Sequence, residues 1–201
     1  MTGVQALQRK HPGRPLWPGK VERREFAYIR HGTLAFIVNF DVVTGQVVSP
    51  TCGPRRTEAD FLGHTKRTVE TDPLVRRWHF IVDNLNIHQS ESLVRYVAAR
   101  DRLPDDLGEV GKSGSLQSMA TRASFLSDPA HSIVLHYTPK HCSWLNQIEI
   151  WFSILVRKVL RRGNFTSTDD LRQKVLAFID YFNRTMAKPF RWTYDGKPLV
   201  V

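Results

Sequence analysis

The apolar positions in the first quarter of the chain follow a period of two. Apolar clusters occupy residues 25–29, 33–40 and 46–50, and polar or turn-forming residues separate them. Short apolar runs bounded by turn residues are typical of β-strands, so we expect a meander of three strands. The preceding residues 1–24 mix proline, glycine and basic side chains without a period, which predicts an extended basic segment or loop.

A helical period begins after this meander. Residues 57–71 place apolar side chains three and four positions apart, and Thr57 with Asp60 resembles a capping box at the start of a helix. The apolar run at 78–83 then predicts a buried strand, and a second helical pattern follows it. The apolar positions of that pattern are Leu93, Val94 and Val97. Strands that alternate with helices are typical of α/β proteins.

The strand and helix pattern resumes after an interruption. Residues 101–131 contain several prolines and glycines, which predicts an inserted loop with a short helix at 116–125. A strand at 132–137 follows, and two helices at 143–162 and 168–184 close the pattern. The apolar face of the last helix consists of Leu171, Val175, Phe178, Ile179 and Phe182.

Length and composition fit one globular domain. The chain has 201 residues, of which 41% are hydrophobic and 24% charged, and we place the domain at 25–184 with a tail at 185–201. Two cysteines, Cys52 and Cys142, are too few for a disulfide framework. The sequence shows no apolar leader and no apolar run of bilayer length, so we expect a cytoplasmic protein without a membrane partner.

The charge balance narrows the choice of partners. The chain has 29 Lys and Arg against 19 Asp and Glu, a net charge of +10. A surplus of this size favours polyanionic partners through phosphate contacts and counterion release, so nucleic acid is the first partner to consider. A basic surface without any ligand explains the same composition, and composition does not separate the two.

Two acids have surroundings that suit a metal site. Asp83 follows the apolar strand 78–82, where chemistry is found in open α/β sheets. Glu149 lies within a helical pattern of apolar residues, so packing would hold its backbone in place. Carboxylates so placed are suitable ligands for Mg²⁺. A strand-end Asp followed by Asn is also an ordinary turn former, so spacing alone leaves both interpretations open.

Four segments of the sequence resemble the catalytic domain of bacterial insertion-sequence transposases of the mariner-like superfamily. These are DDE-type enzymes with a ribonuclease H-like fold. The segments are RREFAYIRHGTLAF (23–36), FIVDNLNIHQS (80–90), HYTPKHCSWLNQIEIWFSILVRKVLRRGNFTS (136–167) and KPFRWTYDGKP (188–198). The resemblance spans nearly the whole chain, and it implies an α/β fold with a mixed sheet and helices on both faces.

The resemblance also implies roles for individual residues. Asp83 matches the second and Glu149 the third acid of a site that binds two Mg²⁺ or Mn²⁺ ions for DNA cleavage and strand transfer. Residues at the flanking motif positions are suited to hydrogen-bond a carboxylate or the scissile phosphate. These flanking positions hold Asn84, His88, Ser143, Trp144 and Asn146. For Trp144, a role as a core anchor is the preferred interpretation.

The sequence departs from the family at the first acid. In relatives this acid ends the first, central strand just ahead of a stretch that here reads MTGVQAL (1–7). Asp41 and Glu25 do not match it, and a turn explains Asp41. We therefore expect a fold whose central strand is missing or incomplete, and an isolated chain that is inactive. A late start codon, a frameshifted gene or a decayed copy would each explain this departure.

Basic residues provide candidate DNA contacts, because phosphate contacts position a protein on DNA without reading its sequence. These residues are Arg55, Arg56, Arg157, Lys158, Arg161 and Arg162. For the last two, a favourable position at a helix C-terminus is an equally good explanation. We expect double-stranded DNA as the partner and a homodimer that joins two element ends. The alternative is a non-catalytic DNA-binding remnant. Residues 111–113 (GKS) lack the other features of a phosphate-binding loop, so no nucleotide cofactor is expected.

Overall fold

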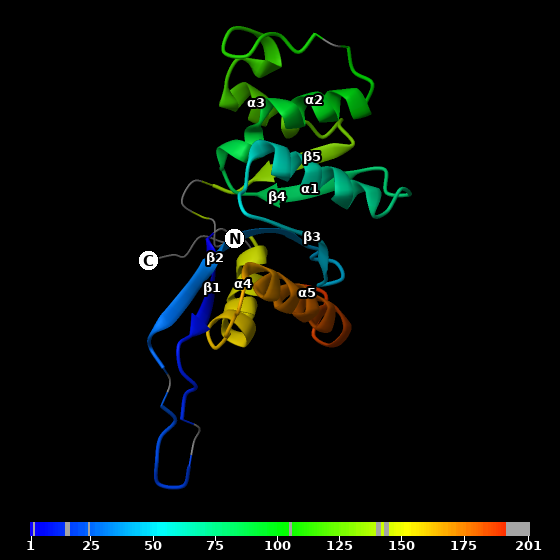
Figure 1. The fold of residues 1–201 in the computed structure, drawn as a ribbon. Coiled ribbons are helices and arrows are strands. Elements are labelled where there is room, and N and C mark those ends of the chain that lie inside the picture. Colours follow the sequence, from blue (N-terminus) through cyan, green and yellow to red (C-terminus); the bar gives the residue numbers. More distant parts are fainter. Residues whose placement is uncertain are drawn as a thin grey trace, which may run out of the picture.

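Residues 1, 3–14, 17–23, 25–104, 106–139, 142 and 145–191 are described in this computed structural model, which shows an α/β fold. Among these residues the strands form two sheets that share no backbone hydrogen bonds. One sheet is antiparallel and three-stranded, in the order β1-β2-β3, and the other is a parallel pair, β4-β5. Figure 1 shows the two sheets in successive parts of an elongated molecule.

The antiparallel sheet is the base of one half of the molecule. It consists of β1 (Val4–Arg9), β2 (Tyr28–Phe40) and β3 (Val47–Gly53). Helices α4 (Ile148–Leu155) and α5 (Thr168–Thr185) cover one face of it, and a π-helical turn, η4 (Val156–Leu160), follows α4. We call these elements together the antiparallel half. Its core contains Val4, Ala6, Phe36, Val47, Trp151, Phe152, Leu155, Leu171, Val175 and Phe182.

The parallel pair is the base of the other half. It consists of β4 (Trp78–Val82) and β5 (Ile133–Tyr137). Helices α1 (Glu58–Glu70), α2 (Glu91–Arg100) and α3 (Met119–Leu126) pack around one shared apolar cluster with them. Short 3₁₀ turns, η1 (Asn86–Gln89) and η2 (Gly114–Leu116), connect these elements. We call this set the parallel half. Its core contains Val69, Val82, Leu93, Val94, Val97, Leu116, Leu126, Ile133 and Leu135.

Helix α1 joins the two halves. Its side chains reach β2 and β3 through hydrogen bonds between Asn39 Nδ2 and Thr68 Oγ1, at 2.7 Å, and between Thr51 Oγ1 and His64 Nδ1, at 3.2 Å. Ile37 of β2 packs against the apolar cluster of the parallel half. The antiparallel sheet therefore has α4 and α5 on one face and α1 on the other, as the predicted fold class requires.

The structure differs from the sequence prediction near the N-terminus. Residues 4–9, expected in an irregular basic segment, form β1, and Ala6 within it is fully buried. The predicted strands 25–29 and 33–40 are largely one strand, because the pairing of β1 with β2 continues to Arg9 and Tyr28. A bulge opposite Ala6 absorbs the change of register, and Gly32 lies there with φ of +118°, which a glycine adopts without strain.

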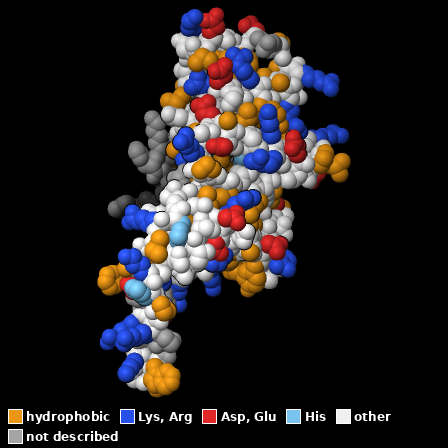
Figure 2. Space-filling view, in the orientation of Figure 1, with side chains coloured by type: hydrophobic (Ala, Val, Ile, Leu, Met, Phe, Trp, Pro, Cys, Tyr) orange, Lys and Arg blue, Asp and Glu red, His pale blue; other side chains and the backbone are white. Residues whose placement is uncertain are grey.

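Beyond β1 and β2 the two chain segments continue away from the body of the molecule as a long hairpin arm, visible at the foot of Figure 1. Isolated bridges pair Arg14 with Arg23 and Trp17 with Lys20. Basic and large apolar side chains of this arm are exposed together, including Trp17 and Phe26. Figure 2 shows the same mixture of blue and orange side chains over the arm.

The other predicted elements are confirmed. Helix α1 begins with the predicted capping box, in which Thr57 Oγ1 accepts from the Asp60 N–H and the Asp60 carboxylate accepts from the Thr57 N–H. The predicted insertion contains η2 and α3. Helix α5 buries four of the five predicted apolar residues, and Phe178 packs partly against them. The predicted helix at 143–162 is wrong in part: the α-helix covers 148–155, and the N–H of Arg161 then bonds to Val156 O at 2.8 Å, which makes a π-turn.

None of the helices in the described part of the chain combines the length and the apolar character that a bilayer crossing requires.

Candidate active site

A groove runs between the two sheets, with strand β2 on one side and strand β4 on the other. Its volume is about 690 Å³. Residues 36–43 line one wall and residues 78–83 the other, while Ile148 and Phe152 of α4 and Phe61 and Thr68 of α1 contribute from above and below. Met1, Arg56, Asp83 and Glu149 also line this groove. The lining is mainly apolar along its length, and these four residues add charged groups.

Asp83 follows the last residue of β4, as the sequence predicted. Its side chain is 37% exposed, and its Oδ1 lies 2.8 Å from His88 Nδ1. The same nitrogen makes a hydrogen bond with the backbone oxygen of Asp83 at 2.9 Å. Because the imidazole points mainly at that backbone oxygen, Oδ1 is buried without a directed hydrogen bond from any described residue.

His88 is fixed from several sides. It lies in η1, its ring centroid is 4.4 Å from that of Phe61, and its backbone oxygen accepts a hydrogen bond from the Tyr137 hydroxyl at 2.9 Å. The His88 side chain is only 12% exposed. These contacts hold the imidazole beside Asp83, so its position is set by packing and not by solvent.

His88 also sets the ionisation of Asp83. The hydrogen bond and charge of His88 lower the pKa of the Asp83 carboxyl below its usual value, Arg56 adds a smaller lowering, and partial burial opposes both. The net direction favours the carboxylate form at neutral pH. Asp83 therefore presents an ionised oxygen at the end of the groove.

Glu149 comes from the other half of the molecule. It lies in the first turn of α4, is exposed, and donates its backbone N–H to Asn146 O at 3.0 Å. Asn146 holds this turn next to β4, because its Nδ2 donates to Ile81 O at 3.2 Å and its Oδ1 accepts from the Ile148 N–H at 3.3 Å. The backbone carrying Glu149 is thus tied to the strand that ends at Asp83.

The α-ammonium group of Met1 brings the two acids into relation. Burial and the charge of Arg56 lower the pKa of this group to about 6, while Glu149 and Asp83 act in the opposite direction. Both carboxylates are therefore near enough to the same nitrogen to influence it. The structure brings Asp83 and Glu149 to the same end of one groove.

Two oxygen donors of this kind fit a hard divalent cation, which prefers carboxylate ligands. The buried Oδ1 of Asp83, which lacks a directed donor, is the type of atom that a cation would satisfy. Within the described ranges, however, no group of three or more His, Cys, Asp or Glu side chains is arranged to hold a metal ion. The described residues supply two ligands of such a site.

Comparison with protein families agrees with this geometry. The family described as DDE superfamily endonuclease matches residues 2–172, which include β1, both acids and the start of α5. The chain belongs to this family. Its membership implies a DNA substrate, and enzymes of this superfamily generally use divalent metal ions. No significant match was found among curated proteins or among solved structures.

The other predicted site residues of this DDE superfamily endonuclease lie at different distances from the two acids. Asn84 is next to Asp83 in the chain, but its side-chain amide donates to Thr138 O and so joins the ends of β4 and β5. Arg55 is exposed before α1. Arg157 and Lys158 are exposed on η4, and Arg161 and Arg162 are exposed just after it. Ser143 and Trp144 lie outside the described residues.

Sequence reasoning missed three contributors to the site. It assigned Arg56 to DNA alone, whereas the structure places it in the groove, where its charge acts on Asp83 and Met1. It gave no role to Phe61 or Tyr137, which fix His88. The apolar pattern explains both aromatic residues as packing positions, and no signal in one sequence distinguishes a core aromatic that also positions a histidine.

Proposed function

We propose that this chain provides most of the catalytic domain of a transposase that cuts DNA and joins strands at the ends of an insertion element. The observation that carries the proposal is the position of Asp83 and Glu149 at one end of the same groove, in a chain of the DDE superfamily endonuclease family. Water would attack a phosphodiester first, and the freed 3′ hydroxyl would then attack the target DNA.

In this proposal Asp83 and Glu149 hold Mg²⁺ or Mn²⁺, which stabilises charge on the attacking and leaving oxygens of the phosphate. His88 keeps Asp83 ionised and oriented, with contacts of 2.8 and 2.9 Å to its Oδ1 and backbone oxygen. Asn146 fixes the turn that carries Glu149 through its bond to Ile81. Asn84 acts indirectly, by holding the loop after β4 against the end of β5.

We further propose that the chain alone does not cleave DNA. Among the acids of the described residues, Asp41 is held in a turn, where its Oδ1 accepts from the Val43 N–H at 2.9 Å and its Oδ2 from Thr44 at 2.6 Å. Glu25 bonds to backbone N–H groups of the arm. Neither is free to complete the pair, and two carboxylates hold a divalent ion weakly compared with three.

DNA would contact the exposed cations of η4 and of the segment after it. Among the described residues, Arg157 and Lys158 form no ion pair, unlike Lys174 and Arg184 of α5, which bond to Asp170 and Asp180 at 2.8 Å. A cation without an acidic partner has its charge available for phosphate. Two copies of the chain would bring two element ends together, which is the basis for proposing a homodimer.

Titration with Mn²⁺, followed by electron paramagnetic resonance, tests the proposed ligands. We expect weak binding at one site that Asp83→Asn and Glu149→Gln each reduce by more than the ~10–100-fold that is typical of residues behind the ligands. Asp180→Asn, which removes an exposed acid of α5, is the matched control and should change nothing. Unchanged binding in both site variants would contradict the proposal.

A second candidate function is DNA binding without catalysis. The presence of only two acids at the groove end, together with cations of η4 that pair with no acid of the described ranges, favours it. Fluorescence anisotropy with double-stranded DNA separates the two candidates. Binding that is unaffected by Mn²⁺, in a chain that shows no site for the ion, would favour the non-catalytic function.

A further inference from the structure

The groove between the sheets has two unpaired strand edges facing each other. Among the described residues, β2 pairs with β1 and β3, and β4 pairs only with β5. The pairing of β1 with β2 ends at Met1, which both donates to Phe36 O and accepts from the Phe36 N–H, each at 2.8 Å. Strand β2 continues for four more residues, to Phe40, along the wall of the groove.

The backbone groups on the β2 wall point into the groove at alternate residues. Since the N–H and C=O of Phe36 both face Met1, those of Val38 and Phe40 face the same edge. Ile37 is turned towards β3, since its partner across the sheet is Thr51. The β2 wall therefore presents a short row of donors and acceptors that continues the one used by β1.

The β4 wall has the matching pattern. The Trp78 N–H donates to Ser132 O at 2.8 Å, and Val82 O accepts from the Thr138 N–H at 2.9 Å, so residues 78, 80 and 82 face β5. Residues 79 and 81 then face the groove, because successive residues of a parallel strand bond to opposite neighbours. In this structure the side chain of Asn146 bonds to Ile81 O on this edge.

The direction of a strand in the groove is also defined. The Met1 end of the groove is the Asp83 end, because Met1 senses the Asp83 charge. A segment that continued backwards from Met1 would run antiparallel to β2, as β1 does, and parallel to β4. It would join the two sheets into one mixed sheet of five strands plus the new one.

The groove also defines the chemistry of this segment. Ile148 and Phe152 of α4 lie on one face of the groove, and Phe61 and Thr68 of α1 lie on the other. A strand that is covered on both faces needs apolar side chains at successive positions. At about 3.3 Å per residue, a wall of six residues (78–83) corresponds to a strand of roughly 20 Å.

We propose that the groove between β2 and β4 is the acceptor for one further β-strand, an apolar segment of about six residues that continues the β1 ladder directly before Met1. The occupant is a polypeptide segment continuous with β1. The two strand edges and the groove lining support this assignment independently of the proposed catalytic function. The Asn146 amide would give up Ile81 O to the new strand.

Hydrogen exchange on the 201-residue protein tests the proposal. The probe is a synthetic peptide of six Val, Ile and Phe residues with a lysine tail for solubility. We expect the peptide to slow exchange of the Val38, Phe40, His79 and Ile81 amides about tenfold or more. The same peptide with N-methyl groups on alternate residues cannot complete both ladders and should have little effect. The readout involves neither metal nor DNA, so it fails or succeeds independently of catalysis.

A fused variant provides the second measurement. The six-residue apolar segment is placed directly before Met1, and the matched control carries a segment of Ser, Asn and Gly. We expect the apolar fusion alone to raise the Tm by about 5 °C or more and to protect the same four amides. The proposal is overturned if peptide and apolar fusion both leave these amides unprotected, or if the N-methylated peptide protects them equally. It is also overturned if the unmodified chain already protects them as a dimer.

Discussion

The two halves of the molecule are assembled from the sequence in different ways. The parallel half is continuous, since β4, β5 and helices α1 to α3 all lie between residues 58 and 137. The antiparallel half combines the first 53 residues with α4 and α5. Its hydrogen bonds span large sequence separations, as between Asn183 and Val47, 136 residues apart, or between Arg9 and Asn164, 155 residues apart.

The difference between the halves affects the site. Contacts between distant residues form only after a large loss of chain entropy, so the antiparallel half depends on the whole chain being in place. Asp83 belongs to the parallel half and Glu149 to the antiparallel half. The two acids meet only where the halves dock, through Asn146 and Ile81 and through the bonds of α1 to β2 and β3.

The largest expected effect separates the stabilities of the halves. Trp151 is 1% exposed and packs against Phe152 and Phe182, so Trp151→Ala should destabilise the protein by about 3–5 kcal/mol in urea unfolding. Hydrogen exchange should show the greater loss of protection in α5 and the smaller loss in α2. Trp151→Phe is the matched control and should cost less, because it keeps a ring and removes an indole N–H that has no partner in the described residues. Equal losses in α5 and α2 would show one cooperative unit.

The second effect acts on the interface between the halves. His64 is 1% exposed, and burial, together with Arg67, lowers its pKa from 6.5 to about 4. Between those pH values the unfolded chain binds more protons than the folded one, so stability should fall as the pH falls from about 6.5 to about 4, by up to roughly 3 kcal/mol.

Urea unfolding at several pH values measures this dependence. His64→Gln keeps a group that can bond to Thr51 and removes the titration, so its stability should vary less with pH over the same window. An identical pH dependence in the variant and the original protein would assign the effect to other groups.

A smaller effect compares two asparagines beside the acids. Asn146→Ala removes the bond that links α4 to β4, so under the proposed function Mn²⁺ affinity should fall about tenfold, as for residues that orient ligands. Asn84→Ala removes a bond within the parallel half and should reduce the affinity less. Mn²⁺ titration of both variants gives the comparison. A larger effect of Asn84→Ala would place the main constraint on the loop after β4.

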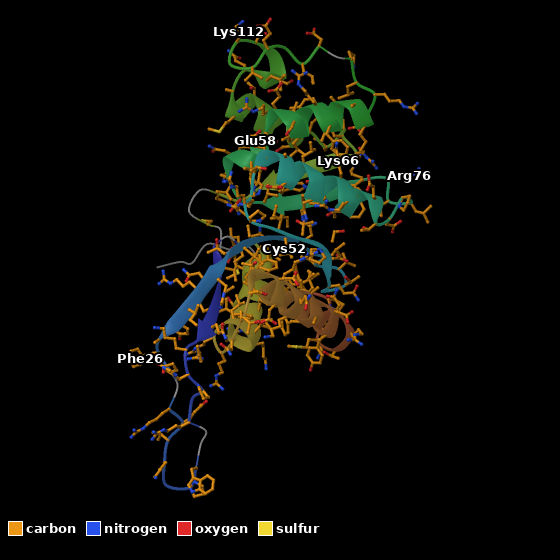
Figure 3. The ribbon with its side chains drawn as sticks, in the orientation of Figure 1. Phe26, Cys52, Glu58, Lys66, Arg76 and Lys112 are labelled. Atoms are coloured by element: carbon orange, nitrogen blue, oxygen red, sulfur yellow. The ribbon has the colours of Figure 1, made fainter. Side chains whose placement is uncertain are left out.

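The smallest effect concerns DNA. The double variant Arg157→Gln with Lys158→Gln removes two exposed cations of the antiparallel half, and the slope of log K against log salt should become shallower by about 0.9 for each phosphate that is no longer bound. Lys112→Gln is the control, since Lys112 lies at the far tip of the parallel half and pairs with Glu109 at 2.7 Å (Figure 3). Equal slopes for all three proteins, measured by fluorescence anisotropy, would remove η4 from the DNA surface.

The elements with a strong period were predictable. Helices α1 and α5 follow from apolar spacing and from caps at Thr57 and Ser167, because local hydrogen bonds and one buried face are enough to define them. Strand β1 was not predictable, since its residues have no clear alternation and it forms by pairing with β2 at the edge of the core. The π-turn after α4 likewise has no local signal in the sequence.

The sequence by itself determined the α/β pattern, the basic charge and the two acids that resemblance to DDE transposases indicated. Only the tertiary structure decided that Arg56 and Met1 share the groove with those acids, that His88 is fixed by Phe61 and Tyr137, and that the described strands form two sheets with facing free edges. Periodicity reports which face of an element is buried, because burial repeats along the chain. It does not report which distant element packs there, because that choice depends on packing between segments separated by more than a hundred residues.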